Sequence, residues 1–193
     1  MGGAVALRYA LAHPNRLAGL VLLDASNAPV RDDGDGNLAF TLLRIPGLNR
    51  TLIEIMPRSI IARSLSQSVS VQGVVTDATI DRYWELARYP GNRTATIARA
   101  SEPRETFRSA DLARLEVPVL ILWGEEDQLV PIAHAGWFAR NLPNATLRSY
   151  PGVGHLPMEE APDRSIADVR DWIAAQEVRG DRTTAASSSV TTR

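Results

Sequence analysis

The sequence predicts an α/β fold built on a parallel sheet, and three predicted strands are the main evidence. They cover residues 17–24, 117–124 and 145–150. The first two are continuous apolar runs without alternation, which is typical of strands covered by helices on both faces. Helical patterns precede and separate the strands, as the crossover connections of parallel strands require.

Residues 2–12 predict a buried helix ahead of the first strand. Val5, Leu7 and Leu11 are among the apolar residues that recur along it, and Pro14 marks its end. Small residues near its start allow a close approach to a sheet. A helix followed by a buried strand is half of a βαβ unit.

The middle of the chain predicts an inserted helical cap. Residues 27–36 are rich in Asn, Pro, Asp and Gly, which is the composition of loops. Helical patterns then follow one another without strand alternation, over residues 38–45, 52–66, 79–89 and 93–100. We therefore expect a core of residues 1–30 and 104–177, with residues 31–103 forming the cap.

The last part of the chain returns to the core. Helical patterns begin at Pro131, after the second strand, and at Pro162, after the third. The final helix carries apolar residues at three- and four-residue spacing. Beyond Glu177 the residues are small and polar, so we expect residues 178–193 to form a disordered tail.

Composition excludes several classes of function. The formal net charge is -1, which provides no electrostatic footprint for nucleic acid or an anionic membrane. All 21 basic residues are Arg, so chemistry that needs a lysine amine is excluded. With no Cys and three His, neither a disulfide nor a thiolate nucleophile is available, and we expect no metal and no cofactor.

The sequence predicts neither a membrane helix nor a secretion signal. No apolar run approaches the roughly 18 residues that a membrane helix requires, and no basic segment precedes an apolar stretch at the N-terminus. We expect a cytoplasmic protein that acts on a small molecule, without nucleic-acid or membrane partners. The sequence does not indicate an oligomeric state.

Two loops carry candidate catalytic side chains. Both follow predicted strands, at the edge of a parallel sheet where ligands bind. The loop after the second strand contains Glu125, Glu126 and Asp127, and the loop after the third contains His155 among glycines. An acid that holds a histidine in one tautomer, so that the histidine can take a proton from a hydroxyl, is the working pair of nucleophilic hydrolysis.

With these motifs, the chain resembles the carboxyl-terminal two-thirds of an α/β-hydrolase-fold enzyme with a helical cap. The segment G-E-E-D-x-x-V-P resembles the family's acid loop at Asp127, and G-x-G-H resembles its base at His155. Met1 and Gly2 resemble the last two positions of the G-x-S-x-G nucleophile elbow. The resemblance implies a cofactor-free Ser-His-Asp hydrolase of esters or related acyl compounds. We expect Glu125 and Glu126 to be solvated loop acids.

The chain departs from the family pattern at the nucleophile. The elbow serine would precede Met1, so the resemblance implies a chain truncated just after that serine. One oxyanion-hole donor would be the backbone amide at the Met1 position. Ser26 would preserve the order Ser, Asp, His, but it lacks the flanking glycines of a strained elbow. We therefore expect this chain alone to be inactive.

Other functions stay open at this point. Within the fold, a haloperoxidase-like enzyme or a hydrolase of carbon-carbon bonds would share the visible residues. Epoxide and haloalkane hydrolases resemble it less, because Met1 stands where their D-W-G elbow has tryptophan. In a different class, the chain is a non-catalytic remnant or binding module, since the strand over 19–24 would lack a neighbour and expose an apolar edge.

Overall fold

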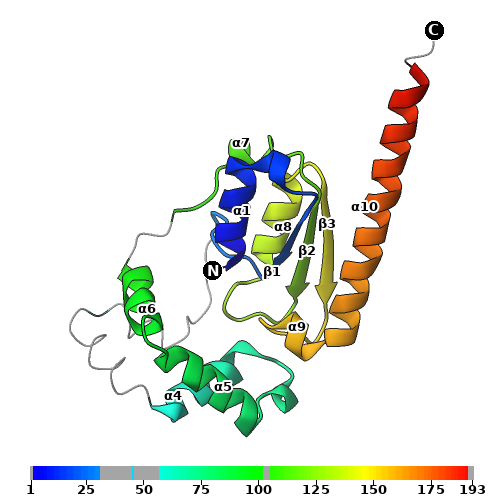
Figure 1. The fold of residues 1–193 in the computed structure, drawn as a ribbon. Coiled ribbons are helices and arrows are strands. Elements are labelled where there is room, and N and C mark those ends of the chain that lie inside the picture. Colours follow the sequence, from blue (N-terminus) through cyan, green and yellow to red (C-terminus); the bar gives the residue numbers. More distant parts are fainter. Residues whose placement is uncertain (1, 31–44, 46–56, 102–104, 191–193) are drawn as a thin grey trace.

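A parallel sheet forms the centre of the computed structural model, which describes residues 2–30, 45, 57–101 and 105–190 (Figure 1). The strand order is β1-β2-β3, and both strand pairs are parallel, as predicted. The register places Val119 opposite Leu20 on one side and Ala145 on the other. The strands are β1 (Leu20–Leu23), β2 (Val119–Gly124) and β3 (Ala145–Tyr150).

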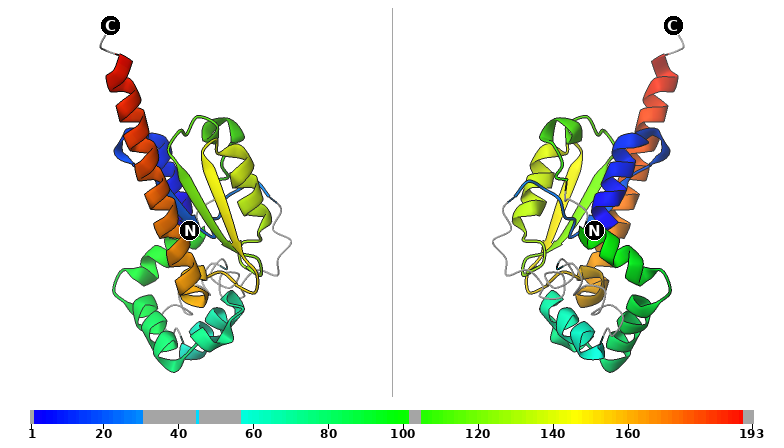
Figure 2. Two further views of the ribbon diagram at one scale, coloured as in Figure 1. Left: turned by 90° about the vertical axis from the view of Figure 1, so that its right-hand side faces the viewer. Right: turned by 90° about the vertical axis from the view of Figure 1, so that its left-hand side faces the viewer.

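Helices cover both faces of this sheet. Helices α1 (Gly2–Ala12) and α8 (Ala133–Asn141) lie on one face, and α10 (Pro162–Val190) lies on the other (Figures 1 and 2). Every residue of β2 is buried, because this strand has a strand on each side and helices above and below. That environment explains the continuous apolar run in its sequence.

Two apolar clusters hold the layers together. The larger joins the sheet to α1 and α8 and includes Leu7, Leu22 and Phe138. The smaller lies on the α10 face, where Trp172 packs beside Leu120 and its neighbours. The chain approaches this ring closely at Gly19, where a Cβ would lie 2.5 Å from Trp172 unless the ring shifted.

Between β1 and β2, the described residues 57–101 form what we call the helical block. It contains α4 (Arg58–Ser68), a 3-10 turn (Gln72–Val74), α5 (Asp77–Arg88) and α6 (Asn92–Ser101). The block lies near the carboxyl ends of the strands (Figure 1). No strand occurs within these residues, in line with the sequence analysis. The helix predicted over 38–45 and the start of that over 52–66 fall outside the described residues, apart from Ile45.

Three short helical segments and a long terminal helix complete the described chain. The short segments are a 3-10 turn (Pro14–Arg16), α7 (Ser109–Leu112) and α9 (Pro157–Glu160). Helix α10 continues to Val190, so the structure differs from the disordered tail predicted from residue 178. No proline interrupts this stretch and Ala185 and Ala186 favour helix. None of the described helices combines the length and apolar character needed to cross a membrane.

Candidate active site

Asp127 lies in the loop after β2, and that loop itself holds the side chain. Oδ1 accepts the backbone N–H groups of Leu129 at 2.8 Å and Val130 at 3.0 Å. An aspartate that bonds the backbone two and three residues further on stabilises a turn. The Asp127 side chain is completely buried, whereas Glu125 and Glu126 are exposed, as predicted for solvated loop acids.

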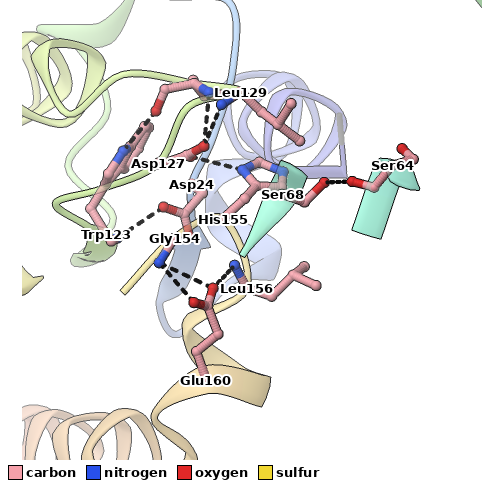
Figure 3. Close-up of polar contacts among 12 residues, drawn as sticks. Asp24, Ser64, Ser68, Trp123, Asp127, Leu129, Gly154, His155, Leu156 and Glu160 are labelled. Atoms are coloured by element: carbon pink, nitrogen blue, oxygen red, sulfur yellow. Dashed lines mark hydrogen bonds and ion pairs between the residues drawn. The ribbon is translucent and has the colours of Figure 1, made fainter. Parts of the chain in front are cut away.

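His155 lies in the loop after β3 and contacts Asp127 directly. Its Nδ1 is 2.8 Å from Asp127 Oδ2, and its backbone N–H donates to the Ser68 carbonyl of the helical block at 2.8 Å (Figure 3). With Asp127 ionised, Nδ1 carries the proton and Nε2 is left as the basic nitrogen. No described group hydrogen-bonds to Nε2, and the side chain is 24% exposed. The two predicted residues are therefore brought together.

A glycine at the end of β2 allows the two loops to meet. A Cβ at Gly124 would lie 1.9 Å from the Gly154 carbonyl oxygen and 2.5 Å from that of Val153. The Glu126 N–H donates to the Val153 carbonyl at 2.9 Å. Contact between the acid and base loops therefore depends on the missing side chain at this position.

Glu160, in α9, ties the His155 loop to the helical block. Two of its backbone donors flank His155 in the chain, and two others lie just after α4. Bonds from N–H groups to an ionised carboxylate are among the stronger protein hydrogen bonds. Sequence reasoning missed this residue, although a buried glycine-rich loop needs acceptors for its N–H groups. The four donors are the N–H groups of Ser70, Val71, Gly154 and Leu156, at 2.8–3.1 Å.

Asp24, directly after β1, was also missed by sequence reasoning. It is 2% exposed, its φ is 43°, and its Oδ1 accepts the Gly124 N–H at 3.0 Å. Burial raises the pKa of Asp24 to about 9; the Gly124 N–H opposes this shift, and the Asp127 and Glu160 carboxylates add to it. The signal was present in the sequence, because Asp24 too follows a strand at the carboxyl edge of the sheet.

Asp24, Asp127 and His155 could be considered as metal ligands. One carboxylate oxygen from each acid and one ring nitrogen lie within 4.8 Å of one another. Hydrogen bonds explain the arrangement better: Asp127 uses both oxygens toward N–H groups and His155, and Asp24 uses one toward Gly124. This donor set does not favour a metal site.

The remaining site expectations concern the nucleophile and the oxyanion hole. Met1 lies outside the described residues, so its predicted backbone donor is not placed. The Ser26 hydroxyl donates to Asn27 Oδ1 at 2.8 Å, and the Ser68 hydroxyl donates to the Ser64 carbonyl at 2.7 Å. Within the described ranges, no serine hydroxyl is hydrogen-bonded to His155.

Comparison with known proteins identifies the family. A sequence model described as the alpha/beta hydrolase family matches residues 1–169. The chain belongs to the alpha/beta hydrolase family. The parallel sheet and the loops that follow its strands agree with this membership.

Individual members of the family are similar over most of the chain. A 2-hydroxy-6-oxononadienedioate/2-hydroxy-6-oxononatrienedioate hydrolase from Comamonas testosteroni is 27% identical, covering 90% of this chain and 60% of that protein. A non-heme chloroperoxidase from Streptomyces lividans is 31% identical, covering 84% and 60%. The chain thus spans about three-fifths of the length of these relatives.

Solved structures of family members share the fold. A meta-cleavage product hydrolase from Pseudomonas fluorescens IP01 superimposes with a TM-score of 0.74 at 22% identity, covering 90% of this chain and 61% of that one. A thermophilic esterase from Thermogutta terrifontis gives a TM-score of 0.68 at 24% identity, covering 91% and 62%. At these identities the likeness concerns the fold alone.

Proposed function

We propose that this chain provides the acid and base of a Ser-type hydrolase that acts on a small ester or related acyl compound. The observation that carries the proposal is the 2.8 Å contact between His155 Nδ1 and the buried Asp127 Oδ2. Such a pair fixes the tautomer that leaves Nε2 able to accept a proton. Family membership supports the same reaction class.

In the proposed reaction, His155 acts first as base and then as acid. Nε2 takes the proton of a nucleophilic hydroxyl while its oxygen bonds to the substrate carbonyl carbon. The proton then passes to the leaving group, and an acyl-enzyme forms. A water molecule, deprotonated by Nε2, then attacks the acyl-enzyme, and the carboxylic acid product leaves as the nucleophile regains its proton. Throughout, the Asp127 carboxylate stabilises the transient imidazolium. The nucleophile of this scheme is the elbow serine expected before Met1.

The relatives suggest two probe substrates within this class. One similar structure is an esterase, and several similar proteins are hydrolases of 2-hydroxy-6-oxo dienoates. Both kinds of compound present a carbonyl carbon to a nucleophile. A p-nitrophenyl ester and a 2-hydroxy-6-oxo dienoate are therefore suitable probe substrates. The helical block is proposed to act as the cap over the substrate.

The experiment compares the 193-residue chain with the longest in-frame protein that contains it. We expect hydrolysis when the three residues before Met1 read G-x-S and so complete the elbow with Met1 and Gly2. Asp127→Asn should then lower kcat by about 10⁴-fold, because the wrong histidine tautomer is favoured. His155→Ala should reduce activity at least as far. Glu126→Gln is the matched control, since this exposed acid lies next to Asp127 in the same loop.

Two results would contradict the proposal. Unchanged rates in Asp127→Asn or His155→Ala would show that this pair is not catalytic. A folded protein with an intact elbow that hydrolyses neither probe would instead favour the non-catalytic binding module. Hydrolysis by the 193-residue chain alone would place the nucleophile within it, and Ser26→Ala would be the first variant to test.

A further inference from the structure

Asp24 is a buried acid that the proposed mechanism does not use. Within the described part of the chain, its Oδ2 has no hydrogen-bond partner and is inaccessible to solvent. Its backbone has a left-handed φ of 43°, a conformation that costs energy for most residues and that Asp and Asn tolerate best. An unsatisfied, buried carboxylate oxygen beside a second carboxylate requires an explanation.

The two neighbouring acids differ in the number of groups that stabilise a negative charge. Asp127 faces three such groups: the N–H groups of Leu129 and Val130, and Nδ1 of His155. Asp24 faces one, the Gly124 N–H. Because two nearby carboxylates do not readily both ionise, the one that accepts more hydrogen bonds keeps the charge and the other keeps a proton. This comparison places the proton on Asp24, at its unpartnered Oδ2.

We propose that Asp24 is a positioning residue, a neutral carboxylic acid whose Oδ2–H is directed toward Asp127 and holds that carboxylate in place for His155. The inference deepens the proposed function, on which its catalytic consequence rests. Three facing groups define its surroundings: Asp127 from the loop after β2, His155 from the loop after β3, and Glu160 from α9. All are acids or bases of the same site.

The proposal has a consequence for stability. The pKa of Asp24 is raised from 3.8 to about 9 by burial, with the neighbouring carboxylates adding to the shift. A raised carboxyl pKa means that the folded state binds the proton more tightly than the unfolded state. The contribution of Asp24 to the free energy of unfolding is therefore fully present below pH 3.8 and is lost as pH rises toward about 9.

Two substitutions separate the proton from the backbone strain. Asn and Gly both tolerate positive φ, so neither Asp24→Asn nor Asp24→Gly is dominated by strain. Asn keeps an acceptor for Gly124 and places an N–H donor where the acid would hold its proton. Gly removes both. Asn27→Gly is the matched control, because Asn27 is also buried with a φ of 78° but belongs to another hydrogen-bond group.

The first measurement needs no catalysis. In the full chain, ¹³C NMR of the Asp24 carboxyl, assigned by its loss in Asp24→Asn, should show a protonated group at pH 7 that titrates near 9. The free energy of unfolding, measured with urea, should decline as pH rises toward about 9, and Asp24→Asn should abolish this decline. Titration of Asp24 near pH 4 in the folded chain would overturn the proposal. So would saturable binding of added Zn²⁺ that displaces the Asp24 proton.

The second measurement uses the active hydrolase. We expect the activity of the parent to decline above pH 9, and we expect Asp24→Asn to keep kcat within about threefold at pH 7 and to lack that decline. Asp24→Gly should lower kcat by about tenfold or more with KM unchanged, since a donor to a charged group is lost. Equal kcat in the two variants would overturn the positioning role. A protonated Asp24 in a protein without hydrolytic activity would instead count against the proposed function alone.

Discussion

Asp127 and His155 are neighbours in space but are held by different means. Asp127 is fixed by N–H groups from its own loop, two and three residues further along the chain. His155 depends on distant elements: the Ser68 carbonyl at the end of α4, and Glu160, which bonds the N–H groups on both sides of it. The acid is therefore positioned locally, whereas the base is positioned by tertiary packing.

This difference predicts how the site responds to change. Disturbing the helical block should displace His155 while the Asp127 turn persists, since no bond of that turn comes from the block. A substitution at Gly124, where the two loops meet, should displace both His155 and the Asp127 turn. The following variants test the contrast, from the largest expected effect on the free energy of unfolding to the smallest.

Gly124→Ala should have the largest effect, about 3 kcal/mol or more of destabilisation. The new Cβ would meet two backbone carbonyl oxygens, at 1.9 and 2.5 Å, and backbone yields less readily than a flexible side chain. Urea unfolding measures the loss, and NMR of the His155 ring should show the contact with Asp127 weakened. Gly73→Ala is the control, because open space surrounds that position. Equal stability of the two variants would contradict the tight contact between the loops.

Glu160→Gln should destabilise by about 2 kcal/mol, because an amide has one acceptor oxygen and its NH₂ group faces N–H donors. Amide hydrogen exchange should accelerate at Gly154 and Leu156, while Leu129 and Val130 in the Asp127 turn keep their protection. Glu159→Gln, one residue earlier in α9, is the matched control. Faster exchange in the Asp127 turn to the same degree would show that acid and base are not held independently.

Tyr83→Phe should have the smallest effect, about 1 kcal/mol. The Tyr83 hydroxyl donates to Glu159 at 2.8 Å, a second link between the helical block and α9 that does not touch the His155 loop. Burial, followed by the bond to Glu159, raises the pKa of Tyr83 from 10.0 to about 12. The contribution of Tyr83 to the free energy of unfolding is present below pH 10.0 and is lost as pH rises to about 12. Tyr83→Phe should therefore lack this alkaline loss of stability.

The control for this last substitution is Tyr89→Phe, because Tyr89 is 65% exposed. Stability should be measured for both variants by urea unfolding across the alkaline range. A change in the His155 ring resonances in Tyr83→Phe as large as that in Glu160→Gln would show that any link to the block positions the base. That result would show that positioning of His155 does not depend specifically on the hydrogen bonds of Glu160.

Much of the sheet was predictable from local pattern. Strand β3 coincides with the predicted run over 145–150, and β2 begins two residues later than the predicted run over 117–124. Burial on both faces of β2 leaves an unbroken apolar sequence, whereas β3 is partly exposed and carries polar residues. Strand β1 is shorter than its run, since residues 17–19 form the connection into it. The terminal helix was predicted to end near Glu177, because composition cannot show how far a helix continues along polar residues.

By itself, the sequence determined the pair of Asp127 and His155. Each follows a strand of a parallel sheet, whose carboxyl ends meet at one edge, and the turn that holds Asp127 is closed within four residues. Only the tertiary structure decided the roles of Asp24 and Glu160. The donors of Glu160 come from segments more than eighty residues apart, and the proton assigned to Asp24 depends on the burial and proximity of another acid. Such properties arise from packing, because charge and hydrogen bonding depend on neighbours that the chain order does not reveal.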